Sequence, residues 1–127
     1  FFNGKTADRR SQTLEPATQL DILWTSGDTE VFNKVVYIYA LNSKRQQWWQ
    51  NVELIIWGPS ARLLAEKEKL QEKVGTLLKT GVSLTACKWC ADEYGVSEEL
   101  SRLGVEVKYM GKPLTGYLKN NHKVLVF

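Results

Sequence analysis

The chain has 127 residues and a mass of 14.5 kDa, which fits one domain with one hydrophobic core and leaves no room for a second full domain. Its 43% hydrophobic and 24% charged residues are typical of a folded globular protein and exclude a disordered chain. The net charge of +3 is small and the basic residues are spread along the chain, so no nucleic-acid partner is expected. No apolar run approaches the roughly 18 residues that cross a bilayer, so no membrane partner is expected either.

The first half of the chain predicts an arm followed by alternating strands and helices. Residues 1–18 are polar without apolar periodicity and are expected to form a flexible N-terminal arm. A strand is predicted over 20–24, and a helix with a wide buried face is predicted over 29–43. A second strand over 52–57 is closed by a Gly-Pro-Ser turn, in which Ser60 can cap the next helix.

The second half of the chain continues this alternation. Residues 61–79 are predicted to contain a short helical start at Leu63-Leu64 followed by a charged amphipathic helical stretch. A third strand over 82–86 then runs directly into Cys87. Two short helical pieces follow over 91–95 and 97–103. The remaining predicted elements are a strand over 105–110, a loop at Gly111-Lys112, a short helix over 113–120 and a final strand over 123–127.

Strands that alternate with helices favour parallel pairing and right-handed crossovers. We therefore expect residues 19–127 to form one α/β domain, a three-layer sandwich with a mostly parallel five-stranded sheet. In such sheets, ligands and chemistry gather at the carboxyl ends of the strands. Three strand ends are rich in polar or reactive residues, namely 25–28, 58–60 and 87–90.

The cysteines bear on both compartment and chemistry. Two cysteines are too few for a secreted disulfide scaffold, and the close spacing of Cys87 and Cys90 points to thiol chemistry or to a tight local disulfide. The pattern favours a reducing compartment, so we expect a cytoplasmic protein. The chain begins at Phe1 instead of a methionine, which indicates that an upstream segment was removed by truncation or processing.

Cys87 is the first candidate catalytic residue. It follows a predicted strand and precedes a predicted helix, so its sulfur should lie near unpaired backbone amides and the positive end of the helix dipole. Such surroundings, with Lys88 as an adjacent cation, favour the nucleophilic thiolate. The alternative interpretation is that Cys87 is a buried core residue at a strand end.

Cys90 is the second candidate, because it lies one helical turn further on and can attack a mixed disulfide or persulfide formed on Cys87. Three other interpretations stay open: Cys90 packs in the core, the pair acts as a thioredoxin-like dithiol, or the pair binds zinc. The zinc interpretation is weak because His122 is the one other strong soft-metal donor, so no metal and no cofactor is expected.

Weaker candidates surround these thiols. Ser26 and Asp28 of the first loop, together with Gly58 and Lys88, can line a substrate pocket, although Ser and Asp there also suit helix capping. His122 lies in a polar loop and is expected to be exposed and non-catalytic.

The sequence resembles the DsrE/DsrF-like family. The resemblance is carried by GVSLTACKWCADEYGV, LGVEV and YMGKPLTGYL within residues 81–118, and it extends back through IIWGPS at 55–60 to Leu20. It implies a flavodoxin-like fold, homo- or hetero-oligomers and, in the sulfur-relay members, a cysteine after the third strand that carries sulfur as a persulfide. Cys87 occupies the matching position. Sulfur-relay subunits typically have a basic pair just before the glycine that matches Gly95, whereas this chain has Glu93-Tyr94 there. The second cysteine, Cys90, belongs to a variant pattern that resembles the one in family members of unassigned function.

The leading hypothesis is therefore a sulfurtransferase-like relay protein in which Cys87 accepts sulfane sulfur, holds it as a persulfide and passes it to an acceptor. The expected partners are copies of the same chain and sulfur donor and acceptor proteins. Two alternatives remain: an oligomeric small-ligand-binding module in which Cys87 is structural, and a redox protein that cycles Cys87 and Cys90 as a dithiol.

Overall fold

A five-stranded sheet forms the centre of the molecule. A computed structural model describes residues 16–127, so the first fifteen positions of the predicted arm lie outside the described residues. The strands are β1 (Gln19–Trp24), β2 (Asn51–Ile56), β3 (Ser83–Cys87), β4 (Glu106–Lys108) and β5 (Lys123–Val126), in the order β4-β3-β2-β1-β5. All four strand pairs are parallel. The predicted α/β class is confirmed, and the sheet is parallel throughout.

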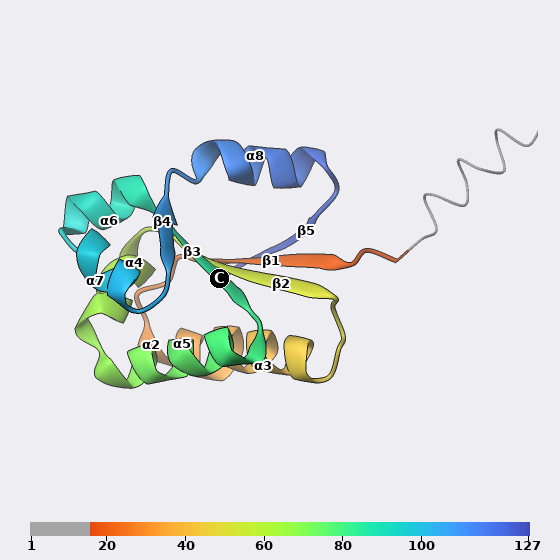
Figure 1. The fold of residues 1–127 in the computed structure, drawn as a ribbon, viewed down its shortest axis with the longest axis horizontal. Helices are drawn as coiled ribbons and strands as arrows, with labels where there is room; N and C mark the ends of the chain where they lie inside the picture. Colours follow the sequence, from red (N-terminus) through yellow and green to blue (C-terminus); the bar gives the residue numbers. More distant parts are fainter. Residues whose placement is uncertain (1–15) are drawn as a thin grey trace, which may run out of the picture.

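Helices cover both faces of this sheet, as the sequence predicted. They are α2 (Thr29–Val31), the π-helical segment η1 (Phe32–Val36), α3 (Tyr37–Arg45), α4 (Pro59–Glu66), α5 (Glu68–Thr80), α6 (Lys88–Tyr94), α7 (Ser97–Arg102) and α8 (Gly111–Lys119). Figure 1 shows α8 on one side of the sheet and α3 with α5 on the other, while α4, α6 and α7 gather at one end. The arrangement is a three-layer sandwich.

The two faces of the sheet differ in chemistry. Side chains alternate across a strand, so β1, β2 and β3 each present two sets. One set is wholly apolar and packs with η1, α3 and α5 in the main core; from β1 and β2 it contains Leu20, Ile22, Trp24, Val52, Leu54 and Ile56. The other set faces α8 and mixes polar with apolar groups; its most buried members are Asp21, Glu53, Ile55, Thr85 and Cys87. The candidate chemistry therefore lies on the α8 face.

Several element boundaries differ from the predictions. The helical region predicted over 61–79 divides at Lys67, whose backbone is extended, into α4 and α5. The position of this break is invisible to apolar periodicity because Lys67 is polar and exposed. Gly111 and Lys112 belong to the first turn of α8 instead of a loop, and β4 spans only Glu106–Lys108.

Ser60 is not the cap of α4, contrary to the sequence prediction. The N-cap is Gly58, whose φ of 72° lies in the left-handed region, and Pro59 occupies the first turn. Ser60 is fully buried, and its hydroxyl donates to the carbonyl oxygen of Trp24. It therefore ties the end of β1 to the start of α4.

Candidate functional site

The carboxyl ends of neighbouring strands are joined by backbone hydrogen bonds. The amide of Ser60 donates to the carbonyl of Thr25 at 3.2 Å, and the amide of Thr25 donates to the carbonyl of Phe127 at 2.6 Å. These bonds hold the loops that follow β1, β2 and β5 at one edge of the sheet, which is the edge where β3 ends in Cys87.

Cys87 stands at the junction of β3 and α6. It is the last residue of the strand and the N-cap of the helix, with extended backbone angles of φ −67° and ψ 115°. Its position between strand and helix is the predicted one. Within the described part of the chain, however, its side chain makes no capping hydrogen bond to α6, so the amides of the helix do not bind the sulfur in this way.

Cys90 lies one turn along α6 and points toward the same region. Both cysteines are free thiols and both are buried, with 5% of Cys87 and 7% of Cys90 exposed. They form a small cluster with Ile55 and Met110. Further apolar cover comes from Leu23, Trp57, Leu114 and Tyr117. The two sulfurs therefore share an apolar compartment between the sheet and α8.

Burial dominates the electrostatic surroundings of Cys90. Burial is the main cause that raises the pKa of the Cys90 thiol, and the neighbouring Cys87 raises it further. A hydrogen bond from the backbone of Gly58 opposes this shift without cancelling it. Cys90 is therefore a protonated thiol at neutral pH, and it is able to donate a hydrogen bond to the Cys87 sulfur.

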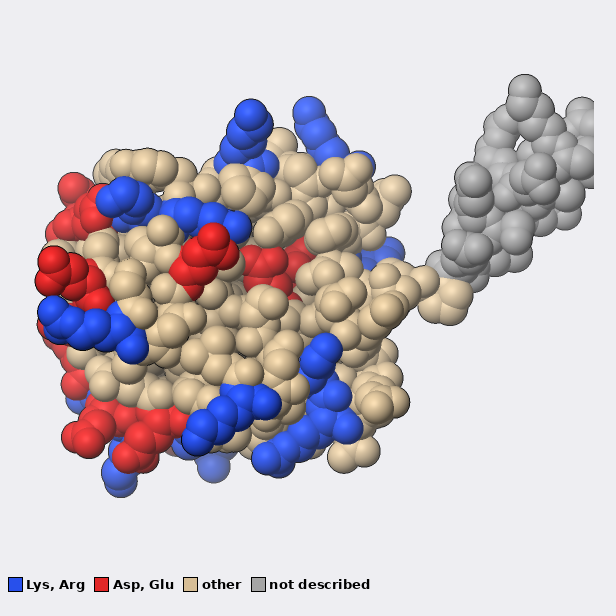
Figure 2. Space-filling model, in the orientation of Figure 1, with Lys and Arg blue, Asp and Glu red and all other residues tan. Residues whose placement is uncertain are grey.

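The charge of Lys88 is engaged by another residue. Its ammonium forms an ion pair with Asp92 one turn further along α6, at 2.8 Å, and this hydrogen bond raises the pKa of Lys88. The same ammonium lies 5.8 Å from the ring centroid of Tyr109. Figure 2 shows acidic and basic side chains interspersed over the visible face at this end of the molecule.

The other predicted pocket residues take different positions. Asp28 caps α2, and its carboxylate accepts hydrogen bonds from the amides of Glu30 at 2.7 Å and Val31 at 3.3 Å. The Ser26 hydroxyl oxygen accepts a hydrogen bond from the amide of Asp28, so both residues stabilise the N-terminal cap of α2. Gly58 lies beside the thiols, through its backbone interaction with Cys90.

A cation reaches the end of α6 from another element. The sequence has Glu93-Tyr94 where the resemblance leads one to expect a basic pair, but the guanidinium of Arg62 on α4 lies over the Tyr94 ring, 5.6 Å from its centroid. Two aromatic side chains near Cys87 are also exposed, with 63% of Trp89 and 63% of Tyr109 accessible. The protein surface around α6 therefore carries exposed aromatic side chains and a cation.

A polar layer beneath α8 was missed by the sequence analysis. Asp21 and Glu53 are paired in register on β1 and β2, and both are buried. Asp21 accepts a hydrogen bond from Gln19 at 2.9 Å and lies 2.7 Å from Nδ1 of His122, while Thr85 donates to Glu53 at 2.7 Å. The prediction of an exposed His122 is wrong, because only 26% of its side chain is accessible. The signal was present in the sequence as single acids inside two apolar strands.

Tyr117 connects this polar layer to the thiols. Its ring packs against the cysteine cluster and stacks on His122, with ring centroids 4.8 Å apart. Burial, followed by the charge of Glu53 and a hydrogen bond to it, raises the pKa of Tyr117 from the ordinary 10.0 to about 12. The phenol therefore stays protonated under physiological conditions and is a fixed hydrogen-bond donor.

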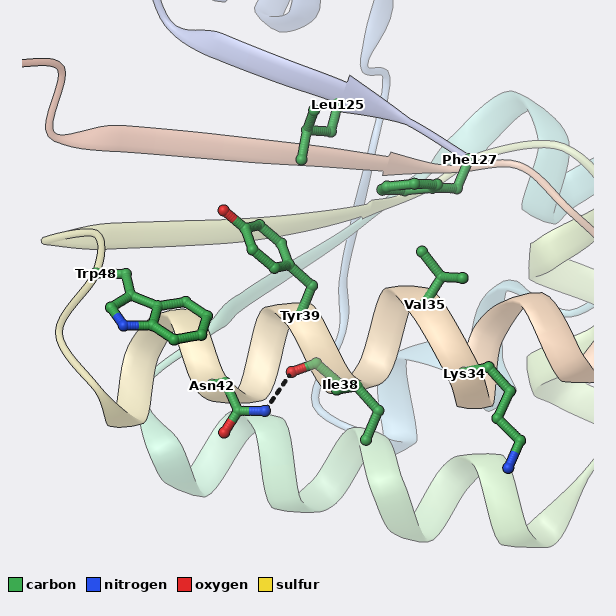
Figure 3. Close-up of a pocket in the computed structure, with 8 residues that line it drawn as sticks. All are labelled: Lys34, Val35, Ile38, Tyr39, Asn42, Trp48, Leu125 and Phe127. Atoms are coloured by element: carbon green, nitrogen blue, oxygen red, sulfur yellow. Dashed lines mark hydrogen bonds between the residues drawn. The ribbon is translucent and has the colours of Figure 1, made fainter.

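A separate apolar groove lies on the opposite face of the sheet from the cysteines. It has a volume of about 360 Å³ and runs between η1 with α3 and the edge strand β5. Figure 3 shows Leu125 of β5 and the C-terminal Phe127 across the groove from Val35 and Tyr39, with Trp48 at one end. Since the sheet separates this groove from Cys87, it is not a pocket for the thiol chemistry.

Residues 16–127 contain neither a metal-binding cluster nor a membrane-spanning helix. No three His, Cys, Asp or Glu side chains are grouped so that they could hold a metal ion. No helix in this range is both long enough and apolar enough to cross a membrane.

The fold and the thiol site together define a small, all-parallel α/β protein with a cysteine pair at the end of its third strand. The DsrE/DsrF-like family matches residues 25–127, and the chain belongs to this family. No curated protein matches the chain.

Two solved structures are similar to this chain. The conserved protein of unknown function BT1422 from Bacteroides thetaiotaomicron is 38% identical, with a TM-score of 0.85 over 87% of this chain and 95% of that one. The ychN protein from E. coli is 20% identical, with a TM-score of 0.66 over 88% of this chain and all of that one, and it supports the fold alone.

The first prediction concerns the Asp21–His122 pair. In His122→Ala, the buried Asp21 carboxylate keeps only Gln19 among the hydrogen-bond partners described above, so the free energy of unfolding should fall by about 1–3 kcal/mol. Urea denaturation measures this loss. Lys123→Ala, an exposed neighbour on β5, is the control and should change stability by less than about 0.5 kcal/mol. Equal effects of the two substitutions would contradict the assignment.

The second prediction concerns Tyr117. A titration followed by phenolate absorbance should show one tyrosine that ionises only near pH 12, and Tyr117→Phe should remove that transition. Because this pKa is higher in the folded chain, the free energy of unfolding should fall as pH rises from about 10 toward 12. Tyr109→Phe, at an exposed position, is the control. A transition that survives in Tyr117→Phe would refute the prediction.

Proposed function

We propose that this chain is a sulfur-relay protein that carries sulfane sulfur as a persulfide on Cys87. One observation carries the proposal: Cys87 ends β3 and caps α6, which is the position that the family resemblance assigns to the sulfur carrier. The thiolate would attack the sulfane sulfur of a donor persulfide, the donor thiolate would leave, and the sulfur would remain bound to Cys87.

The surroundings of Cys90 disfavour this residue as the carrier. The raised pKa of Cys90 keeps that thiol protonated at neutral pH, which makes Cys90 a poor nucleophile. Its S–H group is a donor that would stabilise negative charge on the neighbouring sulfur. In this proposal Cys87 is the catalytic residue and Cys90 supports it.

The burial of the site explains how a bound sulfur would be retained. With 5% of Cys87 accessible, solvent and bulky thiols have little access to a persulfide formed there. A sulfur donor or acceptor protein would therefore contact the exposed Trp89 and Tyr109 at this edge. Arg62 adds a cation at the other end of α6, over the Tyr94 ring.

Loading with inorganic polysulfide tests the proposal. After removal of excess donor, intact-protein mass spectrometry and peptide mapping should locate one added sulfur atom on Cys87 in Cys90→Ser, which has no second thiol to remove it. Cys87→Ser should acquire no such adduct at position 87. An unmodified Cys87 would sink the relay function and favour a binding module in which this cysteine is structural.

Self-association is a separate prediction that follows from the family resemblance. The edge strand β5 and the neighbouring helix α3 expose apolar side chains on one face of the sheet, with 47% of Ile38 and 39% of Leu125 accessible. We expect Ile38→Glu to lower the mass measured by light scattering, because a charge on this surface opposes burial. Leu118→Glu, an equally apolar and 58% exposed site on α8, is the matched control. A wild-type monomer, or an unchanged mass in Ile38→Glu, would contradict this assignment.

A further inference from the structure

The second thiol lies where a persulfide on Cys87 would first meet a nucleophile. Cys87 and Cys90 occupy the N-cap and the third position of α6, and residues three apart are neighbours on a helix surface. Both are packed in one cluster with Ile55 and Met110. They are the two cysteines of the whole chain, so no other thiol of this chain competes for the sulfur.

Burial favours reaction inside the chain. With 5% of Cys87 and 7% of Cys90 accessible, an external thiol has poor access to the bound sulfur, while Cys90 is held beside it at a high effective concentration. The raised pKa of Cys90 slows this attack without preventing it, because a small thiolate fraction remains available. The persulfide therefore has an outlet that needs no partner protein.

We infer that Cys90 resolves the persulfide on Cys87 by displacing its outer sulfur as hydrogen sulfide ion, so that the loaded protein releases sulfide and closes a Cys87–Cys90 disulfide. This inference rests on the proposed loading of Cys87. It adds an activity to the relay, the reduction of sulfane sulfur to sulfide, which the chain performs once per loading.

The chemistry balances without another reactant. The Cys90 sulfur attacks the inner sulfur, which is Sγ of Cys87, and the bond between the inner and outer sulfurs breaks. The outer sulfur leaves with the bonding electron pair and takes the proton of the Cys90 thiol, so it departs as HS⁻. The two cysteine sulfurs are oxidised to a disulfide, and the sulfane sulfur is reduced.

The geometry of the first turn of α6 permits this product. A disulfide needs Cβ atoms about 3.5–4.5 Å apart, whereas residues three apart on a helix have Cβ atoms about 5–6 Å apart. Cys87 is outside the helical conformation, so the approach needs a rotation at the strand–helix junction. A reduced dithiol is restored by a small thiol reductant such as dithiothreitol.

A single-turnover experiment on the full chain tests the inference. Wild type, Cys90→Ser and Cys90→Ala are loaded with inorganic polysulfide, freed of excess donor and followed over time. A sulfide electrode records release, and mass spectrometry after alkylation records the persulfide and the disulfide. In the wild type, sulfide should appear as the persulfide disappears, and the product should resist alkylation until dithiothreitol is added. In both variants the persulfide should last at least about tenfold longer.

The outcomes separate this inference from the proposed function. A persulfide that loads on Cys87 and lasts equally long in the wild type and in both variants would overturn the resolving role and leave the relay standing. Sulfide release without a Cys87–Cys90 disulfide would overturn it as well. A chain that never loads would overturn both. Circular dichroism of the variants, with two different replacements at Cys90, distinguishes loss of chemistry from loss of fold.

Discussion

The parallel pairing of β1, β2 and β3 is the constraint on which the rest of this molecule depends. Because the strands run in one direction, each connection must cross a face of the sheet, and all carboxyl ends meet at one edge. The six paired positions of β1 and β2 also fix which residues share a face. One register therefore sets both the apolar core beneath α3 and α5 and the mixed layer beneath α8.

The α8 face combines two features that a simple core would not have. At one end, Cys87 and Cys90 lie in an apolar compartment, and at the other, Asp21 and Glu53 are buried beside each other. Tyr117 contacts both groups through its ring and its hydroxyl. Buried carboxylates must be satisfied by hydrogen bonds, so α8 and the turn before β5 are held in place by polar as well as apolar contacts.

The thiol compartment gives a physical basis for the proposed chemistry. A persulfide reacts readily with other thiols, so burial protects a persulfide carrier. The same burial leaves Cys90 as the one thiol of the chain with direct access to a persulfide on Cys87. Holding and releasing sulfur would then be governed by the relative access of Cys90 and of an external acceptor to Cys87. The groove between α3 and β5 plays no part in this sulfur chemistry, because the sheet separates the groove from the two cysteines.

Alternating apolar runs were enough to predict the class, the five strands and the strand–helix junction at Cys87, because periodicity and turn residues are local properties. The break at Lys67, the π-helical segment and the capping of α4 by Gly58 depend on how neighbouring elements pack, which no local pattern contains. The tertiary structure alone paired His122 with Asp21 and brought Arg62 to Tyr94. The sequence by itself determined which residues could react, and strand register and helix packing decided which of them meet.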